Sequence, residues 1–161
     1  MPTDPLLASA RYLVGESFEE LRSSIEGLPI QALNWRPAGD ATNSIAALAT
    51  HTVHATRLWL SMAMGAPLPE RDRDAEFREY VDDSAGLLRL VDEFSEDSLT
   101  VLRSAETVDW AAMRKTHGRG GDSPPEVPAA FALIHATEHL RGHVDQMSLT
   151  RQLWEQRARS P

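Results

Sequence analysis

Residues 135–153 read HATEHLRGHVDQMSLTRQL and carry three histidines at intervals of four residues, His135, His139 and His143. Side chains four apart on an α-helix are offset by about 40° and one turn in height, so the three imidazoles would lie along one stripe. His139 and His143 would project side by side, which is the geometry in which two imidazoles can share one cation. The stretch therefore predicts a helix that carries part of a metal site.

The spacing of apolar residues predicts four helices in all. They cover approximately residues 6–25, 44–64, 83–105 and 126–154. Asn43 or Ser44 is suited to cap the second helix, and Gly65 is suited to end it. The fourth helix is expected to begin near residue 126, because Pro128 then falls in its first turn. No segment alternates with period two for long enough to predict a strand.

Four helices of this length predict an all-α fold, a four-helix bundle with long connections. The length of 161 residues fits one domain over residues 1–161 with a hydrophobic core of its own. The connections at 28–43 and 106–125 are long for a simple up-down bundle, and long connections often wall a site. Residues 66–82 are strongly charged, and a short exposed helix is expected there.

Composition excludes several classes of function. The net charge of −8 should repel a phosphate backbone, so nucleic acid is not expected as a partner. The chain has no cysteine, which excludes thiolate ligands and a cysteine nucleophile and suits a reducing cytoplasm. No apolar run is long enough to span a membrane, and the N-terminus does not resemble a signal peptide.

The second predicted helix supplies two more histidines, His51 and His54. His51 falls on the apolar face of this helix, between Leu48 and Ala55. Metal sites in bundle cores take ligands from facing helices, so His51 could complete a site with the histidines of the last helix. The alternative is a metal-free core in which each buried imidazole is satisfied by hydrogen bonds. His117, in a glycine-rich loop, is expected in solvent.

Two blocks of the sequence resemble the DinB-like superfamily of metal-binding four-helix proteins. The first is NSIAALATH at residues 43–51, which follows NWRPAGDA, and the second is the histidine-rich stretch at 135–153. The family's last helix typically continues its third histidine with arginine, glycine and glutamine. In this chain Val144 and Asp145 stand where arginine and glycine are usual, which puts the substrate side of the site in doubt more than the metal.

The resemblance implies a ligand set and leaves other residues open. Its three ligand positions match His51, His139 and His143. His54 and His135 are then candidates to support a ligand or to line the site. Gln146 matches the glutamine of the family pattern, where it would either hydrogen-bond a ligand imidazole or fix the helix end.

Zinc or nickel suits three imidazoles without a thiolate, and the sequence does not separate the two metals. Characterised relatives include thiol-dependent S-transferases, so the resemblance implies a metal-activated low-molecular-weight thiol, or else water, that attacks a small electrophile. It also implies a homodimer. The alternatives are a non-catalytic bundle that a metal stabilises and a metal-free dimerisation module.

Overall fold

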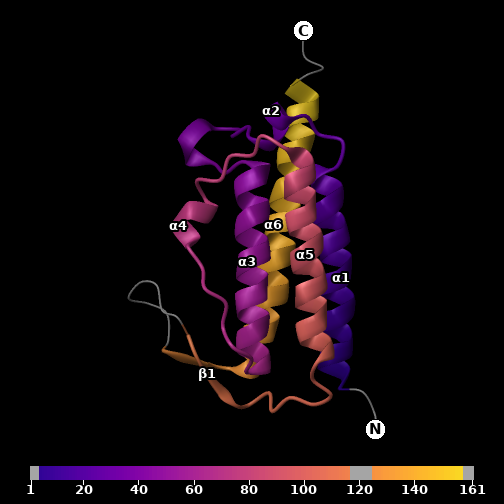
Figure 1. The fold of residues 1–161 in the computed structure, drawn as a ribbon, viewed down its shortest axis with the longest axis vertical. Helices are drawn as coiled ribbons and strands as arrows, with labels where there is room; N and C mark the ends of the chain where they lie inside the picture. Colours follow the sequence, from indigo (N-terminus) through magenta and orange to yellow (C-terminus); the bar gives the residue numbers. More distant parts are fainter. Residues whose placement is uncertain (1–3, 117–124, 158–161) are drawn as a thin grey trace.

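The computed structural model describes residues 4–116 and 125–157. Its chain forms four long helices that stand side by side as a bundle (Figure 1), α1 (Pro5–Ile25), α3 (Ile45–Met64), α5 (Ser84–Arg103) and α6 (Ala129–Arg157). Short elements connect them, α2 (Ile30–Leu33), the 3-10 helix η1 (Gly39–Ala41), α4 (Arg73–Glu76), β1 (Met113–Lys115) and β2 (Glu126–Pro128). The predicted all-α bundle is confirmed.

The order of the helices around the bundle places α3 beside α6. The most extensive helix contact joins α3 to α6, and α3 also packs on α5. α1 packs on α5 and α6, so α1 and α3 lie diagonally opposite each other. The two predicted histidine-bearing helices are therefore neighbours along their lengths, and their facing side chains can meet.

α3 is the most deeply buried helix, and its ends have clear local causes. Ser44 caps the start, where its hydroxyl oxygen accepts a hydrogen bond from the amide of Ala47 at 3.2 Å. Gly65 ends the helix in the left-handed region with φ of 67°, a conformation that favours glycine. Between these ends, the residues from Ile45 to Val53 are all buried. His51 is thus held on a rigid, central element.

The fourth long helix begins later than the sequence indicates. Residues 126–128, which we expected in the helix, form β2 and pair antiparallel with β1. The β-branched Val127 is buried in this ladder, and Pro128, which cannot donate to it, leads into the helix. The amide of Ala129 donates to the carbonyl of Ala112 at 2.9 Å, so the connecting loop satisfies the helix start. Period-two alternation predicted no strand here, because β1 and β2 have only three residues each.

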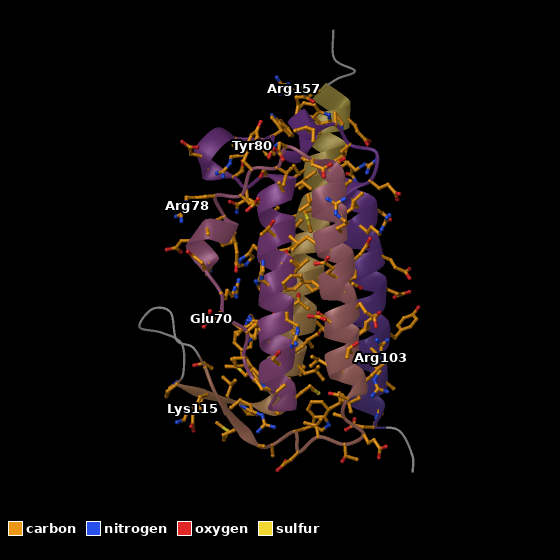
Figure 2. All side chains as sticks on the ribbon, in the orientation of Figure 1. Glu70, Arg78, Tyr80, Arg103, Lys115 and Arg157 are labelled. Atoms are coloured by element: carbon orange, nitrogen blue, oxygen red, sulfur yellow. The ribbon has the colours of Figure 1, made fainter. Side chains whose placement is uncertain are left out.

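The charged segment 66–82 runs along the outer side of α3 and contains α4 (Figure 1). Figure 2 shows Glu70 and Arg78 near opposite ends of α4. Asn34 anchors the end of the segment, because its side chain donates to the carbonyl of Val81 at 2.7 Å and accepts from its amide at 3.0 Å. The short helix that we expected is present, but it is only partly exposed, since Glu76 is buried.

Over the ranges 4–116 and 125–157, no helix combines the length and the apolar character needed to cross a bilayer.

The packing of α1 predicts that truncation of two of its leucines will change the free energy of unfolding by very different amounts. Leu21 has no exposed surface, whereas Leu13 is 50% exposed. Leu21→Ala should lower the free energy of unfolding by about 2–5 kcal/mol, because it removes buried methyl groups and leaves a cavity. Leu13→Ala should lower it by less than about 1 kcal/mol. Urea unfolding followed by far-UV circular dichroism measures both, and equal losses would contradict the packing of α1.

Candidate metal centre

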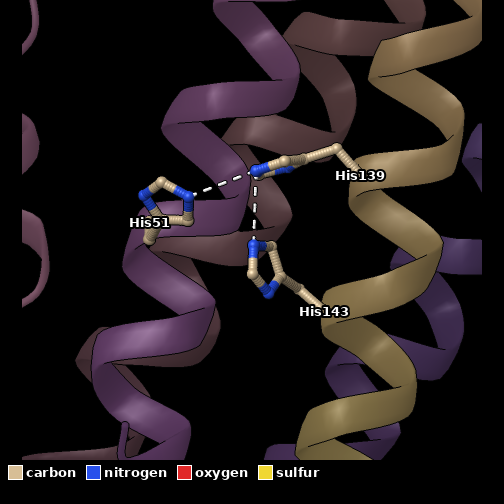
Figure 3. Close-up of side chains that lie close together, drawn as sticks. All are labelled: His51, His139 and His143. Atoms are coloured by element: carbon tan, nitrogen blue, oxygen red, sulfur yellow. Dashed lines mark hydrogen bonds between the residues drawn. The ribbon is translucent and has the colours of Figure 1, made fainter. Parts of the chain in front are cut away.

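Three histidines from two neighbouring helices meet at one point between α3 and α6 (Figure 3). The Nε2 atom of His139 lies 3.3 Å from Nε2 of His51 and 3.3 Å from Nε2 of His143. One nitrogen from each of the three rings lies within 4.8 Å of the others. His51 is buried, while His139 and His143 are each partly exposed. The residues that the sequence predicts as a ligand set are thus brought together.

The far side of the His51 ring faces a buried ion pair. Nδ1 of His51 lies 3.0 Å from Oε2 of Glu76, and Arg71 binds both carboxylate oxygens of Glu76, at 2.7 and 2.6 Å. Burial favours the neutral acid, but the hydrogen bonds from Arg71 and His51 outweigh it and lower the pKa of Glu76 to about 2. Nδ1 of His51 also lies 3.1 Å from a guanidinium nitrogen of Arg71, which can only donate, but that nitrogen makes its shorter bond, 2.6 Å, to Glu76. An ionised carboxylate only accepts hydrogen bonds, so the contact with Glu76 favours the tautomer in which Nδ1 of His51 carries the proton. Its Nε2 lone pair therefore faces the centre.

His143 is oriented in the same way by its own helix. Nδ1 of His143 lies 2.8 Å from Oε1 of Gln146, and donation to this oxygen leaves the Nε2 lone pair facing His139. His139 differs, because its buried Nδ1 has no hydrogen-bond partner among the described residues. The helical spacing of α6 thus places His143, whose ring is oriented by Gln146, beside His139, whose Nδ1 is not held by any described residue.

The centre favours neutral imidazoles. Burial is the largest cause that lowers the pKa of His139 to about 3, and the nearby rings of His143 and His51 add to it. Burial also lowers the pKa of His143, against the opposing hydrogen bond with Gln146. Metal ions bind the deprotonated imidazole, so both rings are held in the form that a cation needs.

The spacing of the nitrogens fits a cation better than it fits hydrogen bonds. Two of the three Nε2 atoms present lone pairs, and a single proton on Nε2 of His139 cannot point well at both. Imidazole nitrogens bound tetrahedrally to zinc at 2.0–2.1 Å would be about 3.3–3.4 Å apart. The two distances of 3.3 Å to His139 agree with that value. His51, His139 and His143 together could therefore hold one divalent ion.

The other predicted candidates lie at different places around this centre. His135 continues the stripe, with its ring centroid 5.6 Å from that of His139, and it contacts Phe131 and Trp59. Gln146 contacts His143, as described above. His54 instead packs edge-on against Phe94 and has no hydrogen bond or ring contact with the three histidines in the described part of the chain. His117 falls outside the described residues.

Sequence reasoning missed the residues that act on His51 from the 66–82 segment. Glu76 and Arg71 form the ion pair, and Phe77 stacks on the His51 ring with centroids 4.2 Å apart. All three lie 20 or more residues from His51, in a stretch whose charges indicate an exposed segment. The sequence contains one weak signal of this arrangement. Asp72 is suited to cap a short helix, and the aromatic Phe77 directly after that helix could pack against a neighbouring element.

Comparison with known proteins identifies the family of this chain. The family model described as the DinB superfamily matches residues 15–147. The chain belongs to the DinB superfamily. The match includes α3, the 66–82 segment and the part of α6 that carries the three histidines and Gln146. No curated protein is significantly similar in sequence to the chain.

Two solved structures share the fold of this DinB superfamily member. A conserved protein from Enterococcus faecalis matches with a TM-score of 0.71 and 15% identity, over 91% of this chain and 95% of that one. A DinB-like protein from Bacillus cereus matches with a TM-score of 0.65 and 16% identity, over 86% of each chain. At these identities the likeness concerns the arrangement of the helices.

The ion pair beside His51 makes a testable prediction about its tautomer. In protein treated with a chelator, ¹⁵N NMR of the imidazoles should show the proton of His51 on Nδ1. Glu76→Ala removes the acceptor and should increase the share of the Nε2–H form, whereas Glu79→Ala should leave the His51 signals unchanged. A wild-type His51 that carries its proton on Nε2 would contradict the role assigned to Glu76.

Proposed function

We propose that this protein is a divalent-metal-dependent enzyme, in which His51, His139 and His143 hold one zinc or nickel ion through their Nε2 atoms. The convergence of three Nε2 atoms, two of them 3.3 Å from the third, carries this proposal. Membership of the DinB superfamily supports it, because the resemblance implies the same three positions as ligands. The donor set contains no thiolate and no carboxylate, which suits a borderline metal.

The open side of the centre supports catalysis over a purely structural role. Structural zinc sites are normally closed by four protein ligands, whereas three ligands leave a position for an exogenous group. His139 and His143 are partly exposed, so a small molecule can approach from their side. A divalent cation there would supply Lewis acidity that lowers the pKa of a bound thiol or water. Glu76 and Gln146 orient the imidazoles by accepting their Nδ1 protons.

The proposed reaction is transfer of a small thiol to an electrophile. The chain has no cysteine, so the sulfur nucleophile would come from a low-molecular-weight thiol. The thiolate sulfur would form a bond to an electrophilic carbon, the leaving group would depart with its electron pair, and the thiol proton would pass to solvent. Water in place of the thiol would give hydrolysis by the same attack.

A second candidate function is supported by the position of the centre. A cation shared by His51 and the two histidines of α6 would cross-link the most extensively packed pair of helices. In this case the metal would stabilise the bundle without catalysis, and its removal would unfold the protein. We also propose that the protein forms a homodimer, which the resemblance implies.

Metal content tests the proposed ligand set. Untagged His139→Ala should lose most of the bound metal, because two imidazoles rarely retain a divalent ion through purification. His54→Ala, which removes an imidazole from the same part of the bundle without touching the three rings, should keep it. Elemental analysis by mass spectrometry measures both variants. Equal metal in the two variants would remove His139 from the site.

Spectroscopy with cobalt separates the two candidate functions. In Co(II)-substituted protein, a small thiol such as 2-mercaptoethanol should change the visible spectrum and add a sulfur-to-metal charge-transfer band. This is the result expected if the centre keeps an open position. A spectrum that no thiol alters, together with unfolding on chelation, would reject thiol transfer and favour the structural role.

A further inference from the structure

Three aromatic rings meet beside the metal centre, at the next turn of the histidine stripe on α6. They belong to Trp59, Phe131 and His135, which we call the ring cluster. The centroid of the His135 ring lies 4.3 Å from that of Trp59 and 5.8 Å from that of Phe131. The centroids of Trp59 and Phe131 are 6.4 Å apart. α3 and α6, which supply the three candidate ligands, therefore also supply one aromatic surface between them.

The ring cluster is continuous with the metal centre. Phe131, His135 and His139 are spaced by four residues on α6, so their side chains lie along one stripe of the helix. The centroid of His135 is 5.6 Å from that of His139, and Phe131 is two turns, or about 12 Å, from His139 along the helix axis. A small molecule with one end at the metal could therefore place its other end against the rings.

The rings are accessible, and core packing does not account for them. Phe131 is 48% exposed, whereas the adjacent Ala132 and Leu133 supply the buried face of this turn of α6. The side chain of His135 is 31% exposed, and its Nδ1 lies 3.7 Å from a carboxylate oxygen of Glu138, which is itself exposed. An aromatic surface that remains open next to a candidate reaction centre is typical of a ligand-binding wall.

Trp59 adds a free hydrogen-bond donor to this surface. A partly buried indole N–H usually has a partner, as in Trp110, which donates to a carboxylate oxygen of Asp4 at 2.7 Å. Trp59 is also partly buried, but its indole donates no hydrogen bond within the described residues. Its nitrogen is not one of the fully enclosed atoms that lack a partner, so it is open to solvent. The N–H can therefore donate to an acceptor of a ligand that lies against the rings.

We propose that the ring cluster binds the aromatic part of the electrophile on which the metal centre acts, with the Trp59 indole donating to an acceptor atom beside that aromatic group. The inference rests on the proposed function, because the metal centre provides the reaction. Contact between rings favours a flat aromatic group over an aliphatic group of similar size. The parallel rings of Phe131 and His135 do not enclose a cation, and the nearby divalent ion would repel one.

The test is an NMR titration of zinc-loaded, ¹⁵N-labelled protein with benzamide, which joins a ring to a carbonyl acceptor. A saturable shift of the Trp59 indole signal is expected. The indole signals of Trp35 and Trp154, which contact each other near the far end of α6, should not move. Cyclohexanecarboxamide and tetramethylammonium should bind at least about threefold more weakly. No saturable shift of Trp59, or equal affinity for either of these two ligands, would overturn the proposal.

Cobalt relates the bound ring to the metal. In Co(II)-substituted protein, the ring protons of bound benzamide should relax faster than in the zinc protein, by an amount that corresponds to about 6–12 Å from the ion. Saturable binding without any effect of cobalt would place the ligand elsewhere and overturn the subsite. The proposed reaction fails separately. A thiol that leaves the cobalt spectrum unchanged refutes the reaction, whereas a thiol that changes the spectrum of a protein that does not bind benzamide refutes only the subsite.

Variants of one exposed ring test the contact directly. Phe131→Ala should raise the dissociation constant of benzamide by about three- to tenfold, and Phe131→Tyr, which keeps the ring, should leave it unchanged. Tyr80→Ala is the control, because Tyr80 is 72% exposed and lies towards the end of the bundle marked by Arg157 (Figure 2). Equal weakening by Phe131→Ala and Tyr80→Ala would mean non-specific binding to exposed rings and would overturn the site.

The indole N–H gives an independent comparison. Trp59→Phe keeps an aromatic ring but removes the donor, so it should weaken benzamide about fivefold more than benzene, which has no acceptor. The amides of residues 129–136 report binding in this variant. Equal weakening of the two ligands would overturn the assignment of the Trp59 indole as the donor.

Discussion

The central constraint in this protein is that three imidazole nitrogens meet with too few protons to form hydrogen bonds between them. Glu76 holds the proton of His51 on Nδ1, and Gln146 does the same for His143, so two lone pairs point inward. Protonation would relieve the repulsion, but burial holds the pKa of His139 near 3. The arrangement is consequently unfavourable without a shared positive charge, and one cation at the centre would satisfy all three nitrogens at once.

Helix packing supplies the free energy that keeps these rings together. Each of the three α6 histidines is directly followed by a fully buried apolar residue, namely Ala136, Leu140 and Val144. Burial of each larger side chain contributes about 1.5–3 kcal/mol, so the rotation of α6 is set by its core face. That rotation directs the adjacent histidine stripe towards α3. The centre is thus a consequence of where the core lies, and it does not need to stabilise the helix itself.

The same reasoning explains how much the sequence could predict. Helical spacing is local, so the stripe on α6, the cap at Ser44 and the end at Gly65 follow from the sequence, and an apolar face located His51 on the inner side of its helix. The pairing of β1 with β2 and the docking of Glu76 against His51 depend on contacts between distant segments. Periodicity contains no information about such contacts. The charges of residues 70–79 indicate an exposed segment, and only the fold shows that one carboxylate is buried.

The largely buried pair of Arg71 and Glu76 orients the His51 ring, at a cost in stability that an apolar pair would not carry. Removal of two charges from water costs several kcal/mol per ion, and a well-packed apolar pair often stabilises a protein as much or more. An apolar pair could not accept the Nδ1 proton of His51, and its Nε2 lone pair would no longer be directed at the centre. The ion pair therefore holds the His51 ring in place from the 66–82 segment, outside the four long helices.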